Sequence, residues 1–409
     1  MAFEKLFEPI QVGSIELKNR YAYSPANCFY NWQGYMNEQE LAYYTARAMG
    51  GTGLIIVGAY LSTKFGIPYA NHPFMYVHDI THLPGLAALA DNIRLGGSRS
   101  FVQLLAVPGG LGGNWKDVQP VLPSDVIQTR NLPPFPTAKL IQERTPDSLL
   151  ARGRAESRKA RAVTLEEIQT IINEHTYACR LAAYAGFDGI EVHLCHHYLM
   201  NSFRRKDFNR RSDRYGGSEE NRNRICLELT EASLRAAREE NPNVVVGVRV
   251  GCESDGYTFD ETKRLAVQLQ ELGIDYWNVT WGENHTAHRK DGELVPFAKE
   301  LKKILKIPVI CPSIHDPKIA EEAVAEGCTD IVSTCRSMIA DPDFVNKVKE
   351  NRVDDIIKCT WCGMCSRGVP GLTCILNPET GRERYNPKYQ IRQGPTGADY
   401  LPYVLQKPK

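Results

Sequence analysis

The sequence predicts an α/β fold in which eight parallel strands close into a barrel surrounded by helices, a (β/α)8 TIM barrel. From about residue 164 the chain alternates short, almost wholly apolar runs with longer segments of helical period. Runs of this kind predict a parallel sheet covered by helices, because half-exposed antiparallel strands would alternate polar and apolar residues. Five of these runs, with three similar ones in the first hundred residues, make eight, the number of strands that closes a barrel.

The expected strands are, in chain order, RYAYSPA (20–26), GLIIVGA (53–59), FVQLLAV (101–107), GIEVH (189–193), VVVGVRV (244–250), YWNVT (276–280), PVICP (308–312) and DIVSTC (330–335). Thr164 and Glu167 have the spacing of a capping box and begin a helix that ends near Gly186. Further helices are expected at 218–240, 260–272, 296–306 and 316–326. A doubly wound sheet is the alternative, but the phosphate-binding pattern GxGxxG is absent from the sequence.

The expected barrel occupies residues 1–350. Residues 107–163 read as a long excursion between the third strand and its helix, and loops of this length are often lids or substrate walls. Residues 351–409 form a tail that contains a group of cysteines. We therefore expect a barrel domain followed by a short cysteine-rich segment.

The composition describes a globular chain of 409 residues with 43% hydrophobic and 24% charged residues. A formal net charge of +1 provides no overall field for nucleic acid or an anionic membrane, so we expect neither as a partner. The N-terminus has no apolar run of signal-peptide length, and no apolar run reaches the length of a spanning helix. We expect a cytoplasmic protein.

Four of the twelve cysteines fall within sixteen residues, at Cys359, Cys362, Cys365 and Cys374. Four thiolates suit either an iron–sulfur cluster or structural zinc. The C-x2-C-x2-C run favours a [4Fe–4S] cluster, because a zinc ribbon normally uses two separated C-x2-C pairs.

Polar residues stand where the expected strands end, the face at which barrel enzymes place their reactive groups. His193, His196 and Tyr198 share one strand-end turn, a spacing that suits two donors to one substrate oxygen and a phenol that supplies a proton. His197, between them, is expected to face away. Arg249 ends another strand, and Ser313 and Arg336 follow the last two strands, where barrels bind phosphate.

The stretch GFDGIEVHLCHHYLMNSF (186–203), continued by NRRSDRYGGSEENR (209–222), resembles the signature of the old yellow enzyme family of flavin mononucleotide (FMN) barrels. The entry LFEPIQVGSIELKNRYAYSPAN and the ending DIVSTCRSMIADPDF are similar too, so the resemblance covers roughly residues 5–350. The trailing cysteines resemble the branch that contains 2,4-dienoyl-CoA reductase and trimethylamine dehydrogenase, in which a [4Fe–4S] cluster follows the barrel.

The resemblance implies a role for each matching position. Ser24, Pro25, Ala26, Ala59 and Gln103 would line the flavin ring. Arg249 would lie near its N1–C2 carbonyl edge, and Ser313 and Arg336 would hold the ribityl phosphate. The resemblance also implies that His193 and His196 bind a substrate oxygen, that Tyr198 donates the proton, and that His285 lies at the active site.

Several departures from the family pattern matter. The third strand reads QLLAVPGG where relatives usually have Q-L-x-H-x-G-R, and the gap of eight residues before Cys374 is shorter than in the branch with the cluster. Cys335 stands before Arg336, where many relatives have glycine. Relatives with the cluster continue into dinucleotide-binding domains, whereas only 35 residues (409 − 374) follow Cys374, and a domain needs about 100. We therefore expect electrons to come from a partner protein of the FAD/NAD-binding or electron-transfer flavoprotein type, and we expect the chain to be an oligomer.

The resemblance implies an oxidoreductase that reduces an activated C=C bond in an unsaturated small molecule. An amine dehydrogenase or N-demethylase, which passes electrons out through the cluster, is the alternative within the family. Trimethylamine dehydrogenase has tyrosine where His193 stands, which favours the reductase. A non-catalytic electron-relay subunit is the alternative of another class.

Overall fold

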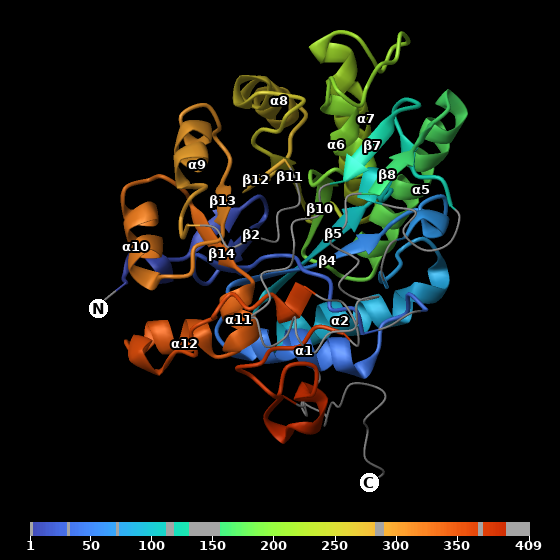
Figure 1. Ribbon diagram of the computed structural model, residues 1–409. Coiled ribbons are helices and arrows are strands. Elements are labelled where there is room, and N and C mark those ends of the chain that lie inside the picture. Colours follow the sequence, from blue (N-terminus) through green and yellow to red (C-terminus); the bar gives the residue numbers. More distant parts are fainter. Residues whose placement is uncertain are drawn as a thin grey trace.

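The computed structural model describes residues 3–30, 33–70, 73–111, 118–130, 156–282, 290–366 and 371–389. Eight parallel strands in this part of the chain close into a barrel, each neighbouring the next in chain order, and β5 pairs with β10 across the excursion (Figure 1). The barrel strands are β3 (Tyr21–Tyr23), β4 (Leu54–Leu61), β5 (Arg99–Leu105), β10 (Gly189–Leu194), β11 (Val245–Gly251), β12 (Tyr276–Thr280), β13 (Val309–Pro312) and β14 (Ile331–Thr334). Each strand overlaps one of the eight runs singled out in the sequence, so the predicted TIM barrel is confirmed.

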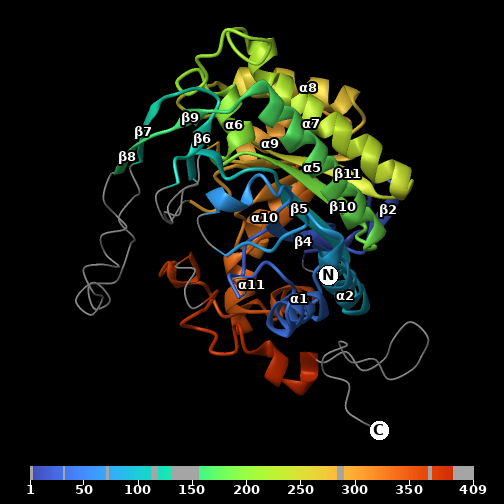
Figure 2. The ribbon, with the colours of Figure 1, turned by 90° about the vertical axis from the view of Figure 1, so that its right-hand side faces the viewer.

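Helices surround this barrel on its outside (Figures 1 and 2). They are α1 (Glu38–Met49), α2 (Leu83–Leu95), α5 (Leu165–Tyr184), α6 (Leu199–Arg204), α7 (Glu219–Glu240), α8 (Phe259–Glu271), α9 (Val295–Lys302), α10 (Pro317–Ala325), α11 (Arg336–Ala340) and α12 (Phe344–Lys349). The capping box of Thr164 and Glu167 is present at the start of α5, as predicted. α9 ends four residues before the predicted 306. Pro308 follows closely, and a proline disfavours the helical conformation of the residue before it.

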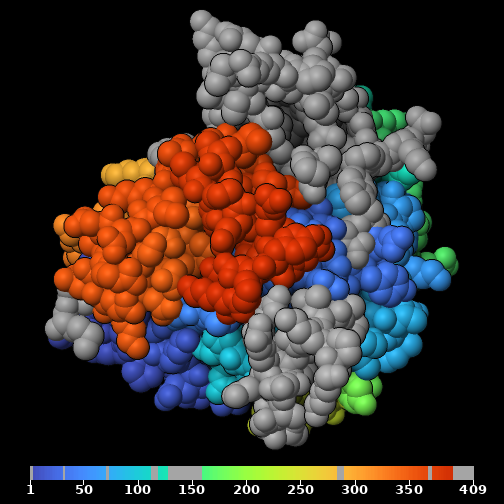
Figure 3. Space-filling model, turned by 90° about the horizontal axis from the view of Figure 1, so that it is seen from below, coloured from blue at the N-terminus to red at the C-terminus, as the bar shows by residue number. Residues whose placement is uncertain are grey.

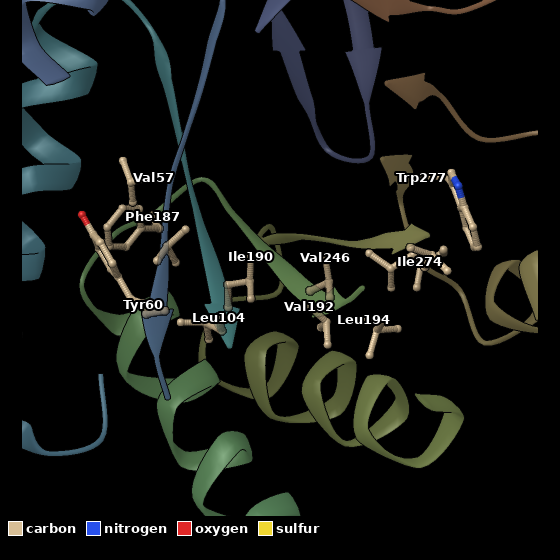
Figure 4. Close-up of a cluster of buried hydrophobic side chains, with 14 of the residues drawn as sticks. Val57, Tyr60, Leu104, Phe187, Ile190, Val192, Leu194, Val246, Ile274 and Trp277 are labelled. Carbon is tan, nitrogen blue, oxygen red and sulfur yellow. The ribbon is translucent and has the colours of Figure 1, made fainter. Parts of the chain in front are cut away.

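The outward faces of the strands build the main core. On β10, Ile190, Val192 and Leu194 are fully buried on the side of the covering helices (Figure 4). The alternate residues Glu191 and His193 therefore point into the barrel, because successive strand side chains face opposite sides. This alternation is what directs polar groups to the barrel axis.

A hairpin closes the N-terminal end of the barrel. Its strands β1 (Ile10–Val12) and β2 (Ile15–Leu17) pair antiparallel, and Val12 and Leu17 are buried among residues at the starts of the barrel strands, including Leu54. The sequence did not reveal this hairpin, because strands of three residues leave almost no periodicity. A reactive site therefore belongs at the opposite, C-terminal end.

The excursion between β5 and α5 contains short strands that the sequence did not predict. They are β6 (Val121–Leu122), β7 (Ile127–Arg130), β8 (Glu156–Lys159) and β9 (Arg161–Ala162). β6 pairs with β9, and β7 pairs antiparallel with β8, so the two ends of the excursion lie side by side (Figure 2).

The segment after the barrel packs against α1 and α11. Arg47 of α1 and Glu383 form an ion pair of 2.9 Å in which both side chains are fully buried. The Nδ2 atom of Asn377 donates to the carbonyl oxygen of Ile339, at 3.1 Å. Figure 3 shows this segment in red between the blue N-terminal residues and the orange helices. Isolated 3-10 turns complete the described elements: η1 (Lys5–Phe7), η2 (Ile67–Tyr69), η3 (Ile80–His82), η4 (Gly109–Leu111), η6 (Val353–Asp355), η7 (Met364–Ser366), η8 (Glu383–Tyr385) and η9 (Pro387–Tyr389).

Among the helices described above, none combines the length and the apolar character that crossing a membrane requires. The division of the chain at residue 350 stays a prediction.

Candidate active site

Two histidines meet at the C-terminal end of β10. The Nε2 atom of His193 lies 3.2 Å from the Nδ1 atom of His196. His193 is 2% exposed, whereas His196 is only partly buried. His196 adopts a φ of 60°, a left-handed conformation that non-glycine residues rarely take. This turn lets both imidazoles face one another although they are three residues apart.

Thr280, the last residue of β12, fixes the far side of this pair. Its Oγ1 atom lies 2.9 Å from the Nε2 atom of His196. A hydrogen bond at one imidazole nitrogen determines which nitrogen carries the proton. Thr280 therefore fixes the orientation of the His196 ring.

Tyr198 lies on the other side of His193. The two ring centroids are 4.8 Å apart, with the planes at 73°. The phenol ring is 7% exposed and packs in an apolar group with Ala59, Leu105 and Leu111. The structure thus brings His193, His196 and Tyr198 together, as the sequence predicts.

His197 takes no part in this group. Its ring nitrogens face the guanidinium of Arg205, at 2.7 Å from Nδ1, and its ring lies 6.0 Å from that of Phe208. The prediction that His197 faces away is confirmed.

A buried polar network lies inside the barrel beneath the histidines. The carboxylate of Glu191 accepts hydrogen bonds from the Nε2 atom of Gln103 at 2.6 Å, the Nδ2 atom of Asn278 at 2.8 Å and the hydroxyl of Tyr276 at 3.1 Å. Burial raises the pKa of the Glu191 carboxyl, and the nearby Arg249 opposes that effect. These partners satisfy both carboxylate oxygens and make the floor of the site rigid.

Arg249 stands beside His193, since the two residues are paired between β10 and β11. Burial, together with the positive charge of Arg249, lowers the pKa of His193 to about 3. His193 is therefore a neutral imidazole across the physiological pH range, with one N–H to donate.

The residues expected around the flavin ring stand at the C-terminal ends of β3, β4 and β5. Ser24 is buried and its Oγ lies 2.8 Å from that of Ser333. Pro25 and Ala26 follow it and are partly exposed. Ala59 is buried within β4, and Gln103 is held by Glu191.

Ser313 and Arg336 come directly after β13 and β14, which are neighbouring strands. Ser313 has a φ of 64°, and Arg336 is the first residue of α11. The guanidinium carbon of Arg336 lies 5.0 Å from the ring centroid of Trp361, in the cysteine segment. The expected phosphate corner therefore adjoins that segment.

The four clustered cysteines are half-buried. They lie close enough to interact electrostatically, Cys359 with Cys365 and Cys374, and Cys365 with Cys362 and Cys374. Burial, the largest cause, raises the pKa of the Cys359 thiol, and the neighbouring Cys365 and Cys374 add to this effect. The backbone N–H of Trp361 and the charge of Arg336 oppose it. Four thiols gathered in one segment are ligands that an iron–sulfur cluster or a zinc ion accepts.

The donors at the strand ends also fit an FMN. The Nε atom of Arg249 is buried without a hydrogen-bond partner in the described chain. A buried unpartnered guanidinium nitrogen is costly, and a flavin carbonyl edge would satisfy it. Phosphate oxygens accept hydrogen bonds only, which matches the donors of Ser313 and Arg336.

Two residues of the site were not predicted from the sequence. Thr280 and Glu191 were not singled out, although a charged residue inside the apolar run GIEVH and a hydroxyl at the end of YWNVT were available signals. His285 falls in 283–289, outside the described residues.

Comparisons with known proteins agree with this geometry. The profile of the NADH:flavin oxidoreductase / NADH oxidase family matches residues 5–355. The chain is 32% identical over 405 residues to an NADH oxidase of Thermoanaerobacter brockii, covering 93% of this chain and 57% of that protein. It is 27% identical to a cinnamate reductase of Clostridium sporogenes, with coverage of 93% and 59%. A solved complex of 2-naphthoyl-CoA reductase with 2-naphthoyl-CoA superposes with a TM-score of 0.80 at 28% identity, covering 95% of this chain and 59% of that one.

The chain thus spans little more than half the length of these relatives. The match of the family profile nevertheless extends over the whole barrel and includes every strand that positions the site. The chain belongs to the NADH:flavin oxidoreductase / NADH oxidase family.

Proposed function

We propose that this chain reduces a C=C bond conjugated to a carbonyl or carboxylate, with FMN and a [4Fe–4S] cluster as cofactors. The observation that carries the proposal is the close pair of His193 and His196 beside Tyr198. Two donors for one oxygen and one phenol as acid are the groups that this reduction requires.

His193 and His196 would bind the substrate oxygen. Their facing nitrogens are 3.2 Å apart, so a single oxygen can lie within hydrogen-bond distance of both. His193 is neutral and donates one hydrogen bond without adding a full charge. Negative charge develops on that oxygen during reduction, and a preorganised donor there typically contributes a few kcal/mol.

Tyr198 would protonate the carbon next to the carbonyl. Its phenol lies beside His193 and is shielded from solvent by apolar neighbours. A buried donor delivers its proton to a bound substrate rather than exchanging it freely with water.

FMN would be held by Ser24, Pro25, Ala26, Ala59, Gln103 and Arg249 at its ring and by Ser313 and Arg336 at its phosphate. When bound, it supplies the hydride that the protein side chains cannot supply. His285 is proposed as a further residue of this site.

The cysteine segment would hold the cluster through Cys359, Cys362, Cys365 and Cys374. Their mutual proximity supports one shared metal site, and the C-x2-C-x2-C spacing in the sequence favours the cluster over zinc. The cluster supplies electrons singly, which is useful when they come from a partner protein of the flavoprotein type. The half-buried cysteines are accessible enough for such a partner to approach.

The substrate class is proposed from two relatives. Cinnamate has a double bond conjugated to a carboxylate, and 2-naphthoyl-CoA is an aromatic acyl thioester. We therefore propose an enoate or an enoyl thioester as the substrate of this chain.

The test is anaerobic mixing of the photoreduced holoprotein with cinnamate or an enoyl thioester. Reoxidation of the flavin, with the saturated product identified by mass, is the expected result. Reduction of the oxidised protein by trimethylamine or dimethylglycine would instead indicate an amine dehydrogenase. A chain that reacts with neither class would contradict the proposed function.

A further inference from the structure

Trp361 lies between two of the clustered cysteines in an unusual backbone conformation. Its φ is 59°, in the left-handed region that bulky residues avoid. In this conformation its backbone N–H donates to the Sγ atom of Cys359, at 3.4 Å. A residue kept in such a conformation must be held there by its surroundings.

Two barrel residues hold the Trp361 ring. Arg336, after β14, places its guanidinium carbon 5.0 Å from the ring centroid. His315, after β13, meets the ring edge to face, at 4.6 Å and 87°. The Nδ1 atom of His315 lies 2.7 Å from the Oγ1 atom of Thr334 and 2.8 Å from the Oγ atom of Ser337. The ring is thus clamped to the ends of the two strands that lead into the phosphate corner.

The Trp361 ring also borders a cavity. Trp361, His315 and Cys359 line a cavity of about 350 Å³, so part of the ring borders open space. Lys318 stands at the rim of the same cavity and is exposed. The contacts with Arg336 and His315 restrain the ring beside this cavity.

We propose that Trp361 is a positioning residue for the cluster: its clamped ring keeps its N–H on the Cys359 sulfur, and this bond and the Arg336 charge together raise the reduction potential of the cluster. The inference rests on the proposed function, because it needs the cluster to be present. It links the cysteine segment to the barrel through a residue that binds no metal itself.

The direction of the effect follows from charge. Reduction adds one negative charge to the cluster, and N–H donors and positive groups near the sulfurs favour the more negative state. Hydrogen bonds to charged acceptors are among the stronger ones and can change an equilibrium constant about tenfold. Loss of either group should therefore move the potential to a more negative value.

The experiment is a redox titration of the anaerobic holoprotein, followed by the electron paramagnetic resonance signal of the cluster. Trp361→Gly keeps the backbone conformation accessible but removes the clamped ring, and it should lower the potential by about 59 mV, a tenfold change for one electron. Trp361→Phe keeps a ring and should stay near the wild-type value.

Arg336→Met removes the positive charge and one side of the clamp and should also lower the potential, whereas Arg336→Lys, which keeps the charge, should recover most of the shift. Lys318→Met is the matched control, since it removes an exposed charge from the same cavity, and it should have little effect. Iron and FMN contents are measured on every variant.

Unchanged potentials in iron-loaded Trp361→Gly or Arg336→Met would overturn this inference and leave the proposed function unaffected. If Trp361→Gly loses its iron while Trp361→Phe retains it, the ring is needed to position the cysteine segment. The comparison of Arg336→Met with Arg336→Lys then tests the effect on the potential. A wild-type protein without iron would overturn the cluster of the proposed function, and this inference with it.

Discussion

The Nε2 atom of His193 lies 3.2 Å from the Nδ1 atom of His196. At this distance a single oxygen could lie within hydrogen-bond range of both imidazoles. The pairing depends on the left-handed backbone of His196. Tyr198 packs against His193 and Thr280 bonds to His196, so the two residues stand on opposite sides of the pair.

Tyr198→Phe should leave FMN binding intact and slow alkene reduction by roughly 10² to 10⁴, the usual contribution of a positioned general acid. The measurement is stopped-flow reoxidation of the reduced flavin by cinnamate or an enoyl thioester. Tyr215→Phe is the matched control, because this buried phenol bonds to Glu228 away from the site. An unchanged rate in Tyr198→Phe would remove the phenol from the mechanism.

Thr280→Val should weaken the binding of a phenolate, a mimic of the enolate, by about fivefold. The isosteric change removes the hydroxyl partner of His196, and a neutral hydrogen bond typically contributes about 1 kcal/mol. Spectroscopic titration with a substituted phenol measures the affinity. Thr176→Val, on the outer helix α5, is the control and should bind phenols normally. Equal affinities in both variants would mean that Thr280 does not orient His196.

The low pKa of His193 predicts a pH dependence of stability. The folded pKa is about 3 against 6.5 for the free side chain, so between these values the unfolded chain binds more protons at this position. The stability associated with the neutral ring is therefore fully present above pH 6.5 and is lost as the pH falls. At pH 5 the loss is about 2 kcal/mol.

Denaturant unfolding of the wild type and His193→Asn at pH 5 and pH 7 measures this loss. The wild type should lose about 2 kcal/mol more than the variant between the two pH values. Parallel losses in the two proteins would show that His193 titrates normally.

Glu383→Ala should lower the free energy of unfolding by about 3–5 kcal/mol, because it leaves Arg47 charged and buried without its partner. The measurement is denaturant unfolding. Lys5→Ala, which breaks the exposed pair with Glu8, is the control and should cost less than about 1 kcal/mol. Similar losses in the two variants would contradict the buried role of the Arg47–Glu383 pair.

Most of the barrel could be predicted from the sequence because each long strand is buried on both faces, as in VVVGVRV. The hairpin of β1 and β2 could not, since three-residue strands have no measurable period. His193 and Arg249 could be predicted as site residues because each is a polar residue near the end of an apolar run.

Contacts between distant segments were not visible in the sequence. The pairing of His196 with Thr280 joins residues 84 positions apart, and that of Arg47 with Glu383 joins residues 336 positions apart. The clamp of Arg336 on Trp361 likewise needs the folded arrangement of the cysteine segment on the barrel.

The measurement that tests the account most directly is cofactor analysis of the wild-type chain purified without oxygen. Extracted flavin, iron, acid-labile sulfide and zinc are quantified per chain. We predict about one FMN, four iron and four sulfide per chain, the content of one flavin and one [4Fe–4S] cluster. Zinc without iron, or a chain that holds no flavin, would contradict it.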